Sequence, residues 1–168
     1  ISESLRALAN EFAAVLQRAF GIGFALADGA TGELFVPSED QPECDWGLRA
    51  ELCRQVASRR QVEFIGEEDP LIVLAVPAES QHGDCLVAVG TFITRPLRPG
   101  ERLARAAERL AIDRRQIDAW AASQTPWSAE QLWRVAELAV EHFWAAGRVA
   151  RLGTEVRSLS VKFAATFE

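Results

Sequence analysis

Leu71-Ile-Val-Leu-Ala-Val-Pro77 and Cys85-Leu-Val-Ala-Val-Gly90 are the two stretches that decide the fold of this chain. Both are short apolar runs. The first predicts a central strand that ends before its proline, and the second lies in the longest predicted strand, residues 84–94. The polar segment between them, residues 77–83, predicts a loop. A glycine inside the longest strand, Gly90, predicts a bulge or a close approach by another group.

A hairpin and a fifth strand are predicted upstream of these two strands. Residues 22–27 and 33–36 predict two short strands, and the segment 28–32, Asp-Gly-Ala-Thr-Gly, supplies the turn chemistry of a hairpin. Residues 62–65 form another short run, and the acidic segment 66–70 predicts the turn that follows it. Because successive strands are joined by short turns, we expect a central, largely antiparallel sheet of about five strands.

Helical patterns flank the predicted strands, which makes the fold class α+β. Apolar residues spaced three and four apart predict helices over residues 2–20, 43–59, 101–111, 113–123 and from 128 onward. The pair Ser128 and Gln131 matches a capping box, which predicts where the last helix begins. The loop 37–42 carries two prolines, which disfavour both strand and helix.

The last predicted helix is too long for the domain that precedes it. No proline occurs from Ser128 to Glu168, and the helical pattern runs to the end of the sequence. A helix of about 40 residues would reach about 60 Å, which exceeds the width of a compact chain of this length. We therefore expect a globular domain over residues 1–127 and a connector helix over residues 128–168. Because the pattern ends in mid-repeat, we also expect one module of a longer protein.

The register of this helix predicts a dimer. From Val135 to Phe163 the mostly apolar seam positions alternate steps of three and four, as in a coiled coil. We expect the part up to about residue 144 to pack on its own domain. The later seam residues are expected to pair with a second copy in a homodimer: Val149, Leu152, Val156, Leu159 and Phe163.

Composition disfavours several classes of partner. The net charge is −6 and no basic stripe occurs, so a nucleic-acid partner is not expected. No apolar run approaches the ~20 residues of a membrane span, and no signal-peptide pattern opens the sequence, so we expect a cytoplasmic protein without a membrane partner. The three cysteines lack a paired spacing, which predicts reduced thiols and no metal site.

The order of elements resembles the GAF sensory fold. GAF domains often carry an apolar strand ending in Val-Pro, a turn with Gly, and a strand ending in a small residue near Gly; here these are Val76-Pro77, Gly83 and Gly90. The resemblance covers residues 1–95, and the last helix matches the family's usual exit helix. It implies a central antiparallel sheet, helices behind it, and a pocket in front under a helix and loops. The spacing of Cys53, Pro77 and Gly90 also resembles that of the related PocR-type sensory domain.

The ligand types of the best-known GAF subtypes are not expected. The Asn-Lys-Phe-Asp-Glu signature of the cyclic-nucleotide-binding type cannot be present, because the chain has one Asn, Asn10, and one Lys, Lys162. Bilin attachment in this family uses a Cys that is frequently followed by His, and no cysteine here precedes one. Haem needs an axial ligand such as His, and His82 and His142 are placed in a loop and in the last helix. No cofactor is therefore expected.

A pocket, if present, is expected between the sheet and residues 36–59. The candidate lining residues are Phe24, Phe35, Trp46, Arg49, Cys53 and Phe64. Aromatic walls with one fixed charge give a small-molecule site affinity and orientation, and Arg49 could hold a carboxylate or a phosphate. The alternative is that the aromatic residues are core and that Arg49 is a solvated helix residue.

Three functions remain open from the sequence. The first is a sensory or regulatory module of a multidomain bacterial signal-transduction protein, which binds a small ligand or partner and signals through a helical dimer to a downstream output domain. The second is a thiol-dependent enzyme of the free methionine sulfoxide reductase type, in which Arg49 and Arg54 would activate Cys53. The third is a degenerate domain that only dimerises. We favour the first, in which this chain has no catalytic residue and only the output domain can be an enzyme.

Overall fold

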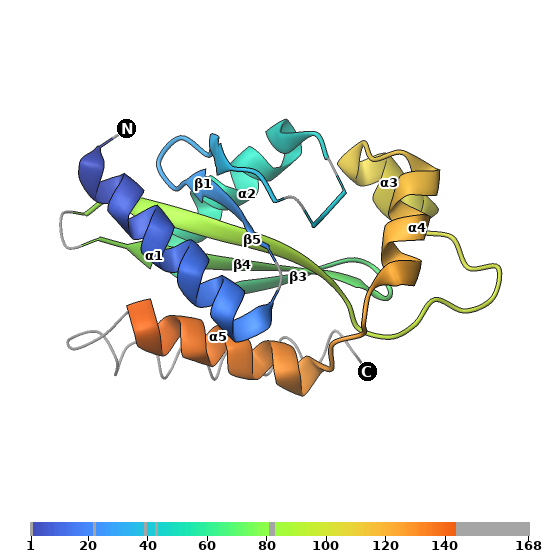
Figure 1. Ribbon diagram of the computed structural model, residues 1–168. Coiled ribbons are helices and arrows are strands. Elements are labelled where there is room, and N and C mark those ends of the chain that lie inside the picture. The colour runs from blue at the N-terminus through green and yellow to red at the C-terminus, as the bar shows by residue number, and fades with distance from the viewer. Residues whose placement is uncertain (1, 22, 39, 43, 81–82, 144–168) are drawn as a thin grey trace.

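The computed structural model describes residues 2–21, 23–38, 40–42, 44–80 and 83–143. The described strands form one antiparallel five-stranded sheet in the order β2-β1-β5-β4-β3 (Figure 1). The elements are α1 (Glu3–Phe20), β1 (Ala25–Asp28), β2 (Leu34–Val36), α2 (Trp46–Arg59), β3 (Glu63–Glu68), β4 (Leu71–Glu79), β5 (Cys85–Ile93), α3 (Ala104–Leu110), α4 (Arg114–Ser123) and α5 (Ala129–Phe143). The α+β class, the antiparallel sheet and its five strands are thus confirmed.

Helices cover both faces of the sheet (Figure 1). Side chains alternate between the two faces of a strand, so Ile72 and Leu74 of β4 join the core formed with α1 and α5, whereas Val73 packs under α2 on the other face. At one end of that second face, Leu71 packs with α3 and α4. Because β4 is buried on both faces, its sequence is a continuous apolar run rather than an alternating one.

Strand β4 runs through the proline at which it was predicted to end. Pro77 pairs with Val87 of β5, and the strand continues to Glu79. On the other side of β4, the β3 ladder begins only at the pair Glu63 and Ala75. Pro77 therefore lies beyond the last β3 partner, where no ladder hydrogen bond requires an amide hydrogen. The predicted loop over 77–83 was wrong for its first three residues.

The predicted acidic turn over residues 66–70 is also shorter than expected. Strand β3 includes Glu67 and Glu68, and the turn itself is Asp69-Pro70. The Glu67 carboxylate lies 2.8 Å from the Arg49 guanidinium, and the Glu68 carboxylate accepts the backbone N–H of Ala106 at 2.7 Å. Both acids are held in the strand because each has a partner on a packed helix.

The predicted starts of the first and last helices are confirmed by their caps. Ser2 accepts the backbone N–H of Leu5 at the start of α1. At α5, Ser128 Oγ accepts the N–H of Gln131 at 3.1 Å, and the Gln131 side chain accepts the N–H of Ser128 at 2.8 Å. This reciprocal pair is a capping box, which satisfies two amides that have no partner within the helix.

The described part of α5 packs on its own domain. Leu132, Val135 and Ala136 are buried against the same core as α1, as expected for the first half of the predicted helix. The expected continuation to residue 168 lies outside the described residues. The same holds for the predicted dimer seam at Val149, Leu152, Val156, Leu159 and Phe163.

Gly90 of β5 marks a close approach, as predicted. It pairs in regular register with Leu74, so the strand has no bulge at this point. A Cβ atom added at Gly90 would lie 2.5 Å from the Phe24 ring, which itself contacts Phe92 with 5.8 Å between ring centroids. The missing side chain of Gly90 therefore makes room for Phe24 in the core.

Gly90→Ala is expected to lower the free energy of unfolding by about 1–3 kcal/mol, because the new methyl group overlaps a packed ring. In a Phe24→Leu background the same change should cost less, since the smaller side chain leaves space. Denaturant unfolding of the four proteins gives the coupling. Equal costs of Gly90→Ala in the two backgrounds would show that Phe24 is not what excludes a side chain here.

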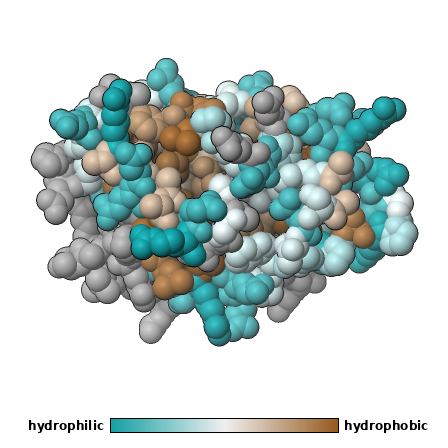
Figure 2. Space-filling view, in the orientation of Figure 1, coloured by the Kyte–Doolittle hydropathy of each residue, from teal (hydrophilic) through white to brown (hydrophobic). Residues whose placement is uncertain are grey.

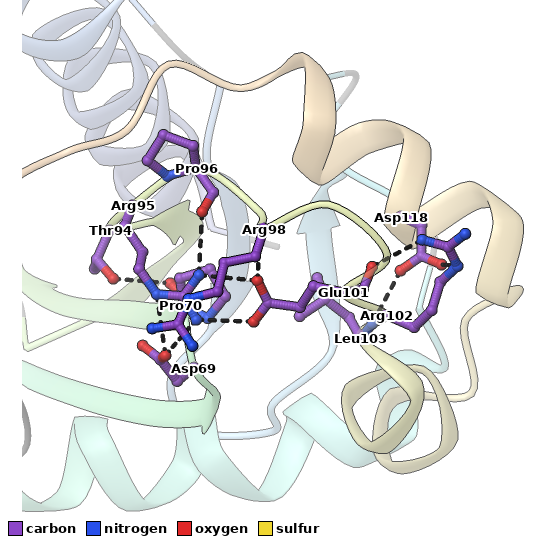
Figure 3. A network of polar contacts seen from close by, with 10 residues as sticks. All are labelled: Asp69, Pro70, Thr94, Arg95, Pro96, Arg98, Glu101, Arg102, Leu103 and Asp118. Carbon is purple, nitrogen blue, oxygen red and sulfur yellow. Dashed lines mark hydrogen bonds and ion pairs between the residues drawn. The ribbon is translucent and has the colours of Figure 1, made fainter.

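A polar network fixes the exit of β5 (Figure 3). Arg95 donates to the carboxylates of Asp69 and Glu101, at 3.1 Å and 2.8–2.9 Å. The Glu101 carboxylate also accepts the Arg98 N–H at 2.7 Å. The hydrogen bonds from Arg95 and Arg98 lower the pKa of Glu101 to about 2. The network ties the β3–β4 turn to the connection that leads into α3.

Glu101→Gln should therefore reduce the melting temperature at neutral pH. A carboxyl whose folded pKa is depressed stabilises the fold above its unfolded pKa of 4.5 and loses this effect as the pH falls toward 2. The difference between wild type and variant should accordingly shrink across that range in melts at successive pH values. Glu108→Gln, which changes an exposed glutamate of α3, is the control and should leave the profile unchanged. A difference that is constant with pH would contradict the assignment.

Candidate ligand-binding site

A partly enclosed cavity of about 280 Å³ lies between the sheet and the helices α2 and α4. Small side chains of β1 and β5 form its floor, among them Ala25, Val89 and Thr91. The remaining lining comes from β2, β4, the loop after β2, and the three helices on this face: Leu34, Pro37, Ser38, Gln41, Pro42, Cys44, Trp46, Arg49, Leu71, Leu110, Ile112, Ile117 and Trp120. Most of these groups are apolar, as is usual for a small-molecule site.

Two tryptophans form walls of the cavity, and both are fixed by a hydrogen bond. Trp46 donates its indole N–H to the carbonyl of Gly32 at 2.8 Å, and Trp120 donates to the carbonyl of Asp40 at 2.9 Å. Because both indole donors are used within the protein, the rings offer a ligand their carbon surfaces. The walls are thus apolar and their orientation is set in advance.

The loop over the cavity is tied to the hairpin. The Ser38 hydroxyl donates to the carbonyl of Gly23 at 3.1 Å, and the N–H of Gly23 donates to the Asp40 carboxylate at 3.2 Å. The end of the loop is held from the other side, where the N–H of Asp45 donates to the carbonyl of Leu110 at 3.2 Å. These contacts shape the cavity before any ligand arrives.

Arg49 brings a buried positive charge to the cavity. Its side chain is 6% exposed, and its guanidinium donates to Glu67 Oε1 at 2.8 Å. The Glu67 side chain is 4% exposed, and its Oε2 accepts no hydrogen bond from the described residues. A second guanidinium, that of Arg109, lies 3.5 Å from Oε2 and is mostly exposed. Two arginines therefore share one carboxylate.

The edge of the sheet next to the cavity is apolar. On the face that Figure 2 shows, polar side chains cover most of the surface, and apolar ones gather in a few patches, one of them left of the upper middle. On the edge strand β2, Leu34 and Val36 are 40% and 37% exposed. Since Leu34 also lines the cavity, this apolar surface adjoins its rim.

A second, more open hollow of about 430 Å³ lies near Gly29 and Cys85. Its charged groups already have partners. Asp84 accepts the Ser2 hydroxyl at 2.9 Å, and Arg54 donates to the carbonyl of Thr31 at 2.9 Å. Because this hollow is more open than the cavity next to Arg49, we take that cavity as the candidate site.

The structure places Trp46 and Arg49, two of the six predicted lining residues, at the cavity. It does not bring the other predicted lining residues there. Phe24, Phe35 and Phe64 pack with the core on the opposite face of the sheet. Alternation explains this, because their neighbours in the strands, such as Ala25 beside Phe24, occupy the cavity face. The remaining candidate, Cys53 of α2, is fully buried between this helix and the sheet.

Several lining residues were missed from the sequence. Ala25 and Thr91 had a usable signal, because strand alternation places them opposite the core residues Leu26 and Phe92. No local signal in the sequence indicated that Ile117 and Trp120 would line the cavity. Their helix, α4, follows the sheet in sequence, and only the tertiary packing of α3 and α4 places it beside the cavity.

The cysteines are poorly suited to thiolate chemistry. Burial raises the pKa of Cys53 to about 11, although Arg49 and Arg54 favour its thiolate. The pKa of Cys85 also rises to about 11, because of burial and then because of the nearby Glu79 carboxylate. At neutral pH both groups are therefore thiols. Cys44 lines the cavity and is partly buried.

Within the described part of the chain, no group of three or more His, Cys, Asp or Glu side chains is arranged to hold a metal ion. Among the same residues, no helix combines the length and the apolar character needed to cross a membrane.

Comparisons of this chain with protein-family models, with curated proteins and with solved structures give no match.

Alkylation should report the raised thiol pKa of Cys85. A shift from 9.0 to about 11 reduces the thiolate fraction at pH 7.5 about a hundredfold. Iodoacetamide should therefore modify Cys85 of the folded protein slowly, and the rate should rise about tenfold per pH unit between pH 7.5 and 9.5. Peptide mass spectrometry follows the site, and the protein in guanidinium gives the unperturbed rate. A rate that levels off below pH 9 would contradict the raised pKa.

Proposed function

We propose that this chain is a GAF-like sensory or regulatory module of a cytoplasmic, multidomain bacterial signalling protein, and that it binds a small ligand in the cavity beside Arg49. The observation that carries the proposal is the cavity itself, with its fixed tryptophan walls and buried charge. Support also comes from the arrangement that the GAF resemblance implies: α1 and α5 lie behind the sheet, and the cavity lies in front under α2 and a loop.

A short path leads from the cavity to α5. Ile117 and Trp120 of α4 line the cavity, and α4 ends only three residues after Trp120, at Ser123. The connection that follows is fixed to the sheet, because the N–H of Trp127 donates to the carbonyl of Ile93 at 2.8 Å. Since Val89 and Thr91 of the same strand, β5, line the cavity, a ligand that shifts α4 relative to β5 would strain this connection and act on the start of α5. This gives occupancy of the cavity a physical route to the C-terminal helix.

The proposal also includes the residues after 143, which lie outside the described part of the chain. We propose that the helix continues past residue 143 and pairs with a second copy through Val149, Leu152, Val156, Leu159 and Phe163. We propose that this helix pair has two arrangements and that the cavity binds its ligand more tightly in one of them. Ligand binding then shifts the pair toward that arrangement, which couples the cavity to an output domain.

The two alternative functions have less support. Thiol chemistry of the methionine sulfoxide reductase type needs a thiolate, and the raised pKa and full burial of Cys53 oppose it. A domain that only dimerises has no use for a cavity with fixed walls. In this proposal the chain itself is not an enzyme.

Filling the cavity is expected to weaken ligand binding. Compounds from a library of small metabolites that raise the melting temperature would be titrated against wild type and against Ala25→Leu, which adds a larger side chain to the cavity floor. We expect at least a tenfold loss of affinity in the variant. Ala13→Leu adds the same side chain at an exposed position of α1 and should bind like wild type.

Hydrogen exchange of the wild-type protein tests the route to α5. A bound ligand should slow exchange in α4 and across residues 124–132. If no compound binds, or if every ligand binds Ala25→Leu as tightly as wild type, the cavity is not the site. Protection confined to the cavity walls would contradict the transmission step alone.

A further inference from the structure

The charge in the cavity decides which ligands it can accept. Arg49 is the only charged side chain among the described residues that line it. An unpaired charge in a low-dielectric site is costly, so a cationic ligand would find repulsion from Arg49 and no carboxylate to pair with. An anionic ligand would find a partner.

The ion pair with Glu67 leaves part of the Arg49 charge available. Within the described part of the chain, the guanidinium donates one hydrogen bond, to Glu67. The same carboxylate lies 3.5 Å from Arg109, and Arg49, Glu67 and Arg109 together line a separate surface hollow, whereas of these three only Arg49 also lines the cavity. Two positive charges against one negative charge leave the cluster with a charge of +1. Arginine presents five N–H donors, so donors remain on Arg49 for a second acceptor.

We propose that the cavity binds a small, flat monocarboxylate, whose carboxylate pairs with Arg49 and whose apolar body lies against Trp46 and Trp120. The inference rests on the proposed ligand-binding function and names the chemical class of the ligand. A planar guanidinium matches a carboxylate with two parallel hydrogen bonds, and a flat apolar body suits walls whose indole donors are already used.

Size and charge separate this class from other anions. A volume of 280 Å³ corresponds to roughly nine water molecules at liquid density, which suits a ligand of about ten non-hydrogen atoms. Cyclic nucleotides and linear tetrapyrroles are much larger. A phosphate monoester carries up to two negative charges at neutral pH, more than the single excess positive charge offers. A monocarboxylate matches both the volume and the charge.

The test uses three probes that share a ring and differ in charge: benzoate, benzamide and benzylamine. Calorimetric titration of the full chain should show benzoate binding at least tenfold more tightly than benzamide, and no binding of benzylamine. Arg49→Gln should lower the affinity for benzoate at least tenfold, because it removes a charged hydrogen-bond donor. Arg109→Gln is the matched control. It also removes one positive charge next to Glu67, but outside the cavity, and should change the affinity less than threefold.

A second variant protects the test against misfolding. Arg49→Gln leaves Glu67 buried with Arg109 alone, which can destabilise the fold. The double variant Arg49→Gln/Glu67→Gln replaces the ion pair by two amides and should keep the melting temperature closer to wild type while losing the preference for benzoate over benzamide. Retention of that preference in the double variant would overturn the inference.

The remaining outcomes distinguish the inference from the function on which it rests. If benzamide or benzylamine binds wild type as tightly as benzoate, and Ala25→Leu abolishes that binding, the anion inference is wrong and the ligand-binding function stands. If none of the three probes, no other small carboxylate such as phenylacetate and no library compound binds, both fail. A phosphate monoester that binds more tightly than every carboxylate would overturn the choice of carboxylate.

Discussion

The pairing of β4 with β5 is the interaction on which the other elements depend. Nine residue pairs join the two strands, from Leu71 and Ile93 to Glu79 and Cys85, and nearly all their side chains are buried. Since the two strands lie next to each other inside the sheet, a slip of one residue would exchange the two faces along its whole length. The fixed register therefore decides which side chains support α1 and α5 and which face the cavity.

The two faces of the sheet are filled differently, and this difference creates the cavity. Toward α1 and α5, large side chains such as Phe12, Phe24 and Phe92 interdigitate, and Gly90 is small to admit one of them. On the opposite face, β1 and β5 present Ala25, Val89 and Thr91, which leave a gap below the helices. Protein interiors are close-packed and lose contacts wherever a void remains. In the roof, Trp46 and Trp120 each donate a hydrogen bond to a backbone carbonyl, which opposes their collapse into the gap.

Much of the architecture could be predicted from the sequence, because the strand patterns, the capping box of α5 and the helix spacing are local signals. The ends of the strands could not be predicted from such local signals. From sequence alone Glu67 and Glu68 resemble turn residues, because their partners, Arg49 and the backbone of α3, are distant in the chain. Pro77 is tolerated in β4 because the ladder with β3 does not extend to it. At the site, the sequence indicated the pocket helix and its two residues Trp46 and Arg49. It misplaced the phenylalanines because they were chosen by residue type rather than by their alternation in the strands, and nothing local indicates that α4 closes the cavity.

The Arg49–Glu67 pair is difficult to explain by stability alone. Moving two charges out of water costs several kcal/mol for each ion, and a well-packed apolar pair of similar volume often serves a fold equally well or better. Glu67 is moreover left with an oxygen that accepts no hydrogen bond from the described residues. A purely structural pair would gain from satisfying that oxygen and from lying away from open space. Arg49 instead lines the cavity, while Glu67 holds its guanidinium in place and Arg109 offsets the carboxylate charge from outside. This arrangement holds a buried positive charge in a residue of the cavity wall, which costs the empty protein stability and, in our proposal, favours a bound anion.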